Sequence, residues 1–294
     1  MAESRQDTAT RVFVAHRELL FSVVYNMLGS VGDTEDVLQE TWLSWAQRNR
    51  APDAAGIDNP RGYLVRVAVN QALAREADIR RRRETYIGPW LPEPLVTTDD
   101  PPASTDAVSM ALLVVLESLS PAERAVFVLH EVFGYGHNEI AGVLGRSAPA
   151  VRQLAHRARG HVQARRPRYR ADPHVRQAAT ERFVAAATGG DLNALLQILS
   201  PEVTLWTDGG GKLPAANLRP IRGRDKVARF LAGASARAPR GLTARYRVVN
   251  GDPAALLLAG ESLFLLIVVD VTDRGDQVCG VYVVGNPDKL ARID

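Results

Sequence analysis

The chain has 294 residues, 46% of them hydrophobic, and a formal net charge of +3. This length predicts two or more domains, and the hydrophobic content is enough for each domain to bury its own core. The single cysteine, Cys279, excludes an internal disulfide, and the polar N-terminus MAESRQDTAT is unlike a secretory signal, so we expect a cytoplasmic protein. The most apolar run, residues 263–269, is too short to span a membrane.

Residues 11–84 have the pattern of successive helices. Apolar residues recur at helical spacing over residues 13–28, and Gly29 and Gly32 interrupt them. The next segment, GDTEDVLQETWLSWAQR, has Asp33 or Thr34 as its expected N-cap and acidic residues in its first turn, where they favour the positive end of the helix dipole. Its acidic side has two interpretations: dipole chemistry with solvation, or a docking face for a basic partner. The side consists of Asp33, Asp36, Gln39 and Glu40.

The segment NPRGYLVRVAVNQALAREADIRRRRE predicts a further helix, which opens at Asn59 and Pro60. It ends in four consecutive arginines, residues 80–83. Such a run is usually a solvated helix end, but it also suits contact with a nucleic-acid backbone. The polar interruptions of its apolar side are Arg61, Arg66, Asn70 and Arg75.

Residues 85–106 form a proline-rich segment, with proline at positions 89, 92, 94, 101 and 102. These prolines exclude a helix and predict an extended linker of limited flexibility. Trp90 and Leu91 in its WLPEP motif are apolar, so we expect them to pack on something. Either they pack on a neighbouring module, or the motif is a partner-binding peptide.

Residues 137–166 have the pattern of a helix-turn-helix. Ile140, Val143 and Leu144 share one face of a first helix, and Gly145 is placed to end it. Ser147 is a good N-cap for the second helix, whose first turn tolerates Pro149. This second helix is expected to bury Val151, Leu154, Ala155 and Ala158.

The outer face of the second helix is cationic, and no acidic residue lies between Glu139 and Asp172. Arginine and glutamine near the start of such a helix suit the major groove of DNA, where they read guanine and adenine. The alternative is an amphipathic helix with a solvated basic face. The outward residues are Arg152, Gln153, His156, Arg157 and Arg159.

Three runs of the sequence resemble regions 2 and 4 of an extracytoplasmic-function (ECF) sigma factor. They are GDTEDVLQETWLSW, NPRGYLVRVAVNQAL and LSPAERAVFVLHEVFGYGHNEIAGVLGRSAPAVRQLAHRAR. These small bacterial subunits direct RNA polymerase to promoters. The resemblance covers about residues 11–166. It implies that Asp33, Asp36, Gln39 and Glu40 dock on the clamp helices of the polymerase. The next helix would bind and help melt the -10 element through Arg61, Tyr63, Arg66, Asn70 and Arg75.

The resemblance also implies that the helix over residues 148–162 reads the -35 element through Arg152, Gln153, His156, Arg157 and Arg159. For Tyr63, two interpretations stay open. An aromatic ring is suited to stacking on an extruded base, and tyrosine is also commonly a half-buried helix residue.

Beyond a hinge at residues 165–173 the composition changes. The sequence first predicts two helices, which Gly189 and Gly190 separate, with Asp191 as the N-cap of the second helix. A strand at residues 203–206 and a helix at residues 224–236 are expected next. Four β-rich segments follow: LTARYRVVN, AALLLAG, SLFLLIVVDVT and VCGVYVVG. This order predicts an α+β domain with a curved antiparallel sheet. It is similar to the SnoaL-like fold.

Three motifs, WLPEP, DGGGK and NPDKL, resemble the ECF subgroup that carries a fused SnoaL-like domain. The DGGGK run lacks the spacing of a Walker A loop, so its glycines are interpreted as a flexible lip near a cavity mouth. The resemblance implies regulatory contacts by the motif residues Trp90, Leu91, Pro92, Asp208, Gly209, Gly210, Gly211, Lys212, Asn286, Pro287, Asp288, Lys289 and Leu290.

The expected architecture is therefore multidomain, with two all-α modules followed by an α+β SnoaL-like cone. Region 2 is expected at residues 8–84, the linker at 85–106, region 4 at 107–166, a hinge at 167–174 and the SnoaL-like domain at 175–294. The expected function is that of a sigma factor that binds core RNA polymerase and promoter DNA. The resemblance implies that its C-terminal domain regulates it in cis, through contacts with the linker and the sigma modules. We expect no enzymatic activity, cofactor, metal or membrane contact.

Two other functions remain open from the sequence. One is a pocket-bearing enzyme or ligand sensor, isomerase-like or hydrolase-like, tethered to a DNA-binding module. All six histidines lie at or before His174, so its chemistry would fall to carboxylates such as Glu261 and Asp270, and a small-molecule ligand stays open. The other is an ordinary repressor, which would use the helix-turn-helix without the acidic docking helix.

Overall fold

The computed structural model describes residues 2–50, 57–97, 108–165, 171–213 and 216–293. The expected linker end at residues 98–106 and most of the expected hinge, residues 167–170, lie outside the described residues. The chain divides into two compact units. One comprises Met1–Arg82, Thr105–Ala107 and Val115–Arg166, and the other comprises Arg83–Ser104, Val108–Val114 and Pro167–Asp294.

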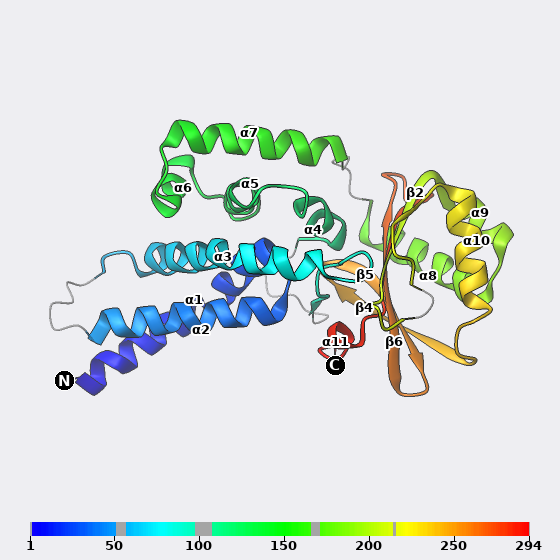
Figure 1. The fold of residues 1–294 in the computed structure, drawn as a ribbon, viewed down its shortest axis with the longest axis horizontal. Helices are drawn as coiled ribbons and strands as arrows, with labels where there is room; N and C mark the ends of the chain where they lie inside the picture. Colours follow the sequence, from blue (N-terminus) through cyan, green and yellow to red (C-terminus); the bar gives the residue numbers. More distant parts are fainter. Residues whose placement is uncertain (1, 51–56, 98–107, 166–170, 214–215, 294) are drawn as a thin grey trace. The chain divides into compact units, whose positions relative to one another are not determined.

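The first unit begins with three helices, α1 (Ala2–Leu28), α2 (Val31–Arg50) and α3 (Pro60–Glu84), drawn from blue to cyan in Figure 1. Aromatic side chains join α1 to α2, since the rings of Phe13 and Trp42 lie 5.3 Å apart. The cap predicted at Asp33 or Thr34 is wrong, because α2 already begins at Val31. The backbone N–H of Asp33 donates to the hydroxyl of Ser30, so Ser30 supplies the oxygen that satisfies the first turn.

The second half of this unit contains the helix-turn-helix. Its elements are α5 (Pro121–Phe127), the π-helical turn η1 (Val128–Val132), α6 (His137–Leu144) and α7 (Ala148–Arg165). Helix α4 (Met110–Leu116) precedes them, and its residues up to Val114 belong to the second unit. Gly145 ends α6 in the left-handed conformation, with φ 60°, and Ser147 accepts from the N–H of Ala150 at the start of α7. The predicted boundaries are thus confirmed. So is the buried face of α7, formed by Val151, Leu154, Ala155 and Ala158.

The second unit is an α+β domain, as predicted. Its helices are α8 (Pro173–Gly189), α9 (Leu192–Ile198), α10 (Arg224–Ser235) and α11 (Pro287–Leu290). Its strands are β1 (Val96–Thr97), β2 (Leu199–Asp208), β3 (Ile221–Arg222), β4 (Leu242–Val249), β5 (Asp252–Ala259), β6 (Ser262–Val271) and β7 (Val278–Val284). Asp191 caps α9 as expected, since its carboxylate accepts from the N–H of Ala194 at 3.0 Å.

The strands form one sheet in the order β1-β4-β5-β6-β7-β2-β3. The sheet is mixed, where the pattern predicts an antiparallel one, because β2 pairs with β7 in parallel. These two strands are far apart in the sequence, and alternation along a strand carries no information on the direction of a distant partner. Strand β1 comes from the linker and pairs with β4 through Val96 and Val249.

The two faces of this sheet have separate cores because successive side chains of a strand point to opposite faces. Leu205, Ile267 and Val283 lie in one core, with residues of α8, α9 and α10. Trp206 and Leu266, each adjacent to one of these residues, lie in the other core, with residues of the linker, α4 and α11. Figure 1 shows α8, α9 and α10 on one side of the sheet and α11 on the other.

No helix of the described residues is both long enough and apolar enough to cross a membrane.

Candidate functional site

The acidic side of α2 divides into one buried and three exposed residues. Asp36, Gln39 and Glu40 are exposed, whereas Asp33 is only 7% exposed. Burial raises the pKa of Asp33, but hydrogen bonds from Arg82, Ser30 and Arg75 outweigh burial, and the net pKa is lowered. Asp33, expected on the polymerase-docking face, is therefore a buried carboxylate that joins α2 to α3.

Arg75 of α3 is the centre of the contact with α2. Its Nε lies 3.1 Å from Oδ1 of Asp33, its Nη1 lies 3.2 Å from Oε1 of Glu40, and its Nη2 donates to Asp36. A guanidinium has five N–H donors in a planar fork, which lets one arginine bind several carboxylates. The exposed carboxylates predicted to dock on polymerase thus contact an arginine predicted to contact the -10 element.

Two other candidates for the -10 element contact the helix-turn-helix half of the same unit. The guanidinium of Arg61 lies 5.2 Å from the ring centroid of Tyr135, within the range of a cation–π interaction. The side-chain amide of Asn70 donates to the carbonyl of Val143 at 3.1 Å. These predicted promoter contacts are therefore engaged within the protein.

Tyr63 is half-buried and lies against its own helical module. Its ring centroid is 5.6 Å from that of Trp45, and the guanidinium of Arg66 lies 5.5 Å from its ring. This arrangement is the half-buried alternative of the two that the sequence allows.

Sequence reasoning missed Arg124 of α5, which is only 3% exposed. Its Nε donates to the backbone carbonyl of Asn26 in α1 at 3.1 Å, and its Nη1 lies 2.6 Å from Glu117. A buried guanidinium is stabilised only where carbonyl and carboxylate oxygens receive its protons. Arg124 therefore fixes the helix-turn-helix half to α1. An arginine inside the apolar LSPAERAVF run was the signal that could have located it.

The outward face of α7 is as predicted. Arg152, Gln153, His156 and Arg157 are exposed, and Arg159 is partly exposed. Two of the five candidates form ion pairs within the module: Nε of Arg157 lies 3.0 Å from Glu123, and Arg159 pairs with Glu131. Arg152, Gln153 and His156 form the part of this face that these two ion pairs do not involve.

In the second unit, the linker is bound by a set of buried and partly buried polar groups that we call the linker clasp: Tyr86, Leu91, Asp208, Asn286 and Lys289. The carboxylate of Asp208 is fully buried and accepts from the backbone N–H of Leu91 at 2.8 Å. It also accepts from the hydroxyl of Tyr86 and lies 2.7 Å from Nζ of Lys289. The amide of Asn286 donates to the same tyrosine hydroxyl at 2.8 Å.

The ammonium group of Lys289 completes the clasp. It donates to the carbonyl of Leu91, so that Asp208 and Lys289 together bind both backbone polar groups of one linker residue. Nζ also lies 4.2 Å from the ring centroid of Trp90. Burial lowers the pKa of Lys289, and the adjacent Asp208 carboxylate opposes that shift. Burial and the same carboxylate raise the pKa of Tyr86, so its hydroxyl stays protonated and donates.

The DGGGK and NPDKL motifs are matched by reciprocal ion pairs. Asp208, which opens the first motif, pairs with Lys289 of the second in the buried clasp. Lys212, which closes the first motif, lies 2.6 Å from Asp288 of the second, and both of these side chains are at least half exposed. The order and charge of the two motifs are thus explained by a single two-pair contact.

The three glycines of DGGGK are sites of close packing, so the expected flexibility is wrong, whereas the expected place beside a cavity is confirmed by Thr207 and Leu213, which flank the motif and line a cavity. A Cβ atom added at Gly210 would lie 2.5 Å from the amide of Asn286, and one at Gly211 would lie 3.0 Å from Ile87 of the linker. Both glycines also have positive φ, 56° and 74°, which other residues rarely adopt. At Gly209 the added atom would lie 2.6 Å from Ala216.

Residues 92–97 of the linker also contact the α+β domain. Glu93 lies 3.2 Å from Arg292, and Pro92 is buried. Leu95 exchanges hydrogen bonds with Asn250, whose backbone N–H donates to the Leu95 carbonyl at 2.9 Å. Asn250 is buried and has φ 52°, a conformation that asparagine tolerates better than most residues. The WLPEP segment packs on a neighbouring module. Sequence reasoning missed both Tyr86 and Asn250.

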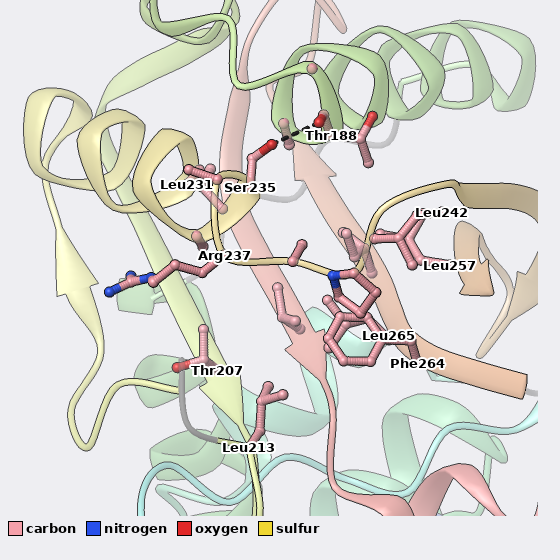
Figure 2. A pocket seen from close by; sticks show the side chains of 18 of the residues that line it. Thr188, Thr207, Leu213, Leu231, Ser235, Arg237, Leu242, Leu257, Phe264 and Leu265 are labelled. Carbon is pink, nitrogen blue, oxygen red and sulfur yellow. Dashed lines mark hydrogen bonds between the residues drawn. The ribbon is translucent and has the colours of Figure 1, made fainter. Parts of the chain in front are cut away.

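Two cavities are relevant to the enzyme alternative. The larger has a volume of about 1280 Å³ and lies between the sheet and α8 and α10, as Figure 2 shows from close by. Its described lining residues include neither a histidine, a cysteine nor a carboxylate. Glu261 is exposed and lines a smaller cavity of about 550 Å³, and Asp270 is in neither lining. Over the described part of the chain, no group of three potential metal ligands occurs.

Comparison with known proteins gives matches along the whole chain. The family described as Sigma-70 region 2 matches residues 12–84, and Sigma-70, region 4 matches residues 109–162. The chain is 39% identical over 292 residues to the ECF RNA polymerase sigma factor SigJ of Mycobacterium tuberculosis H37Rv, covering 95% of this chain and 92% of that protein. It is 31% identical to the probable ECF RNA polymerase sigma factor SigI of the same organism, over 98% of this chain and 96% of that protein. The crystal structure of SigJ superposes with a TM-score of 0.73 at 37% identity, covering 94% of this chain and 96% of that chain.

The two ion pairs of the matched motifs are expected to differ in energy. Lys289→Met leaves the Asp208 carboxylate buried without its cation, so it should lower the free energy of unfolding of the α+β unit by about 3–5 kcal/mol. Lys212→Met, at the exposed pair, is the matched control and should cost at most about 1 kcal/mol. Urea denaturation followed by circular dichroism measures both values.

A double variant tests whether loss of the Asp208–Lys289 ion pair causes the expected loss of stability. Asp208→Asn combined with Lys289→Met should cost clearly less than the two single changes added together, because neither charge is then left alone. Equal costs for Lys289→Met and Lys212→Met, or additive costs in the double variant, would contradict the assignment.

Proposed function

The chain belongs to the extracytoplasmic-function sigma factors, and from that premise we propose that its C-terminal domain restrains the sigma regions in cis by binding the linker between them. As an ECF RNA polymerase sigma factor it directs transcription initiation. The observation that carries the regulatory proposal is the linker clasp. A buried carboxylate and a buried ammonium group bind the N–H and C=O of Leu91.

Both ends of the linker support this restraint. Residues 86–97 contact the C-terminal domain through the clasp, Glu93, Leu95 and strand β1. Past the undescribed part of the linker, Met110 and Ala111 of α4 lie in the same core as Leu91. Ten residues, 98–107, separate these two anchored segments, and ten residues span at most about 36 Å. A linker anchored in this way has far fewer conformations than a free one of 22 residues.

The residues proposed to contact the promoter support the same restraint, because they already bind other parts of the protein. Arg61 and Asn70 contact the helix-turn-helix half, and Arg75 contacts α2. In the proposed resting state these groups bind the protein in place of DNA. Binding of Asp36 and Glu40 to the polymerase would remove two of the three carboxylates that contact Arg75 and free its guanidinium for a phosphate or base.

The residue assignments for polymerase and promoter rest on the resemblance to sigma regions 2 and 4, and the burial of Asp33 leaves it out of the proposed docking face. We propose that Asp36, Gln39 and Glu40 dock on the polymerase, and that Arg61, Tyr63, Arg66, Asn70 and Arg75 contact the -10 element once released. Arg152, Gln153, His156, Arg157 and Arg159 are proposed to contact the -35 element, with the first three most available. We propose that the C-terminal domain acts by binding, without catalysis, because the described lining of the larger cavity contains no carboxylate of the kind that an isomerase or hydrolase would need.

Neutralising the exposed acidic side of α2 tests the docking face. Asp36→Asn combined with Glu40→Gln should weaken binding to core polymerase at least about tenfold, equivalent to about 1.4 kcal/mol, because two charges facing a basic partner are lost. Fluorescence anisotropy of the labelled full chain measures this affinity. The control is Glu18→Gln, an exposed glutamate of α1. Unchanged affinity of the double variant would overturn the assignment of this side of α2 as the docking face.

Removing one hydroxyl from the clasp tests the restraint. Tyr86→Phe deletes the donor to Asp208 and the acceptor for Asn286 while keeping the ring, so it should release the linker and raise promoter-specific transcripts at least about twofold at limiting sigma factor. The matched control is Tyr246→Phe, on a partly buried tyrosine that packs in the other core of the same domain. In vitro transcription with core polymerase measures both. Transcripts unchanged or reduced by Tyr86→Phe would overturn the restraint.

A further inference from the structure

The larger cavity of the C-terminal domain has the composition of a binding site for an apolar molecule. Its volume, about 1280 Å³, lies above the range of about 300–1,000 Å³ that is typical of small-ligand pockets. Apolar side chains from the sheet, α10 and the DGGGK loop line most of it, as Figure 2 shows: Leu213, Leu231, Leu242, Leu257, Phe264 and Leu265.

The hydroxyl side chains in the described lining are already bonded to the protein. The hydroxyl of Ser235 donates to the carbonyl of Thr188 at 2.7 Å, the dashed line in Figure 2, and the hydroxyl of Thr188 donates to Val184 at 2.8 Å. The hydroxyl of Thr207 accepts from the N–H of Asn217 at 2.8 Å. A ligand that buried polar groups here would leave them without partners, which is costly, so the buried part of the ligand must be apolar.

The charges at the cavity have one sign. Arg237 and Arg240, both exposed, are the two ionisable residues in the described lining, and they lie on the segment that joins α10 to β4. Figure 2 shows the side chain of Arg237 extending away from Leu242, Leu257 and Phe264, so its charge lies at the edge of the apolar lining. An anionic group bound there would keep contact with water and with one or both guanidiniums.

The cavity and the linker clasp share strand β2. Thr207 lines the cavity on one face of the sheet, and the next residue, Asp208, binds the linker on the other. Leu213, which follows the DGGGK loop, also lines the cavity. Added Cβ atoms at Gly209 and Gly285 would lie 2.8 Å and 2.6 Å from the Leu213 side chain. This leucine is therefore closely packed against the DGGGK motif and against the residue that precedes NPDKL.

We propose that the larger cavity binds an amphiphilic carboxylic acid, with its hydrocarbon part among the leucines and its acid group at Arg237 and Arg240. Occupancy adds apolar contacts to Leu213 and Thr207 and thereby stabilises the linker clasp. This second step rests on the proposed restraint in cis, and it makes the bound acid an inhibitor of transcription. The binding step is independent of that function.

Calorimetric titration of the full chain with dodecanoic acid, below its micelle concentration, tests the site. We expect one molecule bound per chain. Ala234→Phe, which adds a ring to the lining, should weaken binding at least about tenfold. Arg237→Gln combined with Arg240→Gln should weaken the acid at least about fivefold and leave 1-dodecanol unaffected, whereas Arg229→Gln, an exposed arginine of α10 outside the lining, should change neither.

The outcomes separate the parts of the proposal. No saturable binding, or binding that Ala234→Phe does not weaken, would overturn the cavity as the site. Equal affinity for dodecanoic acid and 1-dodecanol would overturn the assignment of the acid group to Arg237 and Arg240. In transcription, dodecanoic acid should lower transcripts from the unmodified chain and not from Ala234→Phe; binding without this effect would overturn the coupling. Calorimetry contains no polymerase, so absence of binding leaves the restraint in cis intact, and unchanged transcription by Tyr86→Phe leaves the binding site intact.

Discussion

The contact between the linker and the C-terminal domain depends on one buried ion pair. Asp208 and Lys289 lie 2.7 Å apart with side chains 0% and 6% exposed. A buried pair of this kind gains little over an apolar pair of the same size, but it is costly to break. The ion pair instead fixes the position of the linker, because its two charged groups bind the N–H and the C=O of Leu91, and a linker shifted by one residue would present other groups to them. The close packing of the glycines and the tail helix α11 follow from that geometry.

The sheet connects this pair to the rest of the domain. Along β2, Leu205 and Thr207 face α10 and the larger cavity, whereas Trp206 and Asp208 face the linker side. Because Thr207 and Asp208 are adjacent residues of a single strand, the proposed coupling between the two faces needs no long path. The first unit has a comparable device in Arg75, which binds three carboxylates of α2 and is itself a candidate for DNA contact. Both units thus use a few charged groups to hold the segments that, in the proposed function, are released for transcription.

Much of the fold could be predicted from local chemistry. Gly145, Ser147 and Asp191 act as the helix boundaries that their conformational preferences indicate, and the apolar face of α7 follows from helical periodicity. The pairing of β2 with β7 and the start of α2 could not be predicted. The first depends on strands distant in the sequence, and the second on whether Ser30 or Asp33 supplies the capping oxygen.

The motifs of the candidate sites could be identified from the sequence, but the residues that contact one another in them could not. Charge and exposure located Asp36 and Glu40, whereas the burial of Asp33 depends on Arg75 and Arg82, which are more than forty residues away in the sequence. Similarly, WLPEP, DGGGK and NPDKL could be identified, but only the structure shows that Asp208 pairs with Lys289, and Lys212 with Asp288. Tyr86 and Asn250 lie outside the motifs, and their functions depend on long-range hydrogen bonds.

Amide hydrogen exchange of Leu91 in the full chain, free of polymerase, tests the linker clasp most directly, because this N–H has the Asp208 carboxylate as its acceptor. The predicted result is slow exchange in the unmodified chain and at least about tenfold faster exchange in Tyr86→Phe, with Tyr246→Phe unchanged. Exchange of Leu91 at the rate of an unstructured peptide in the unmodified chain would contradict the account.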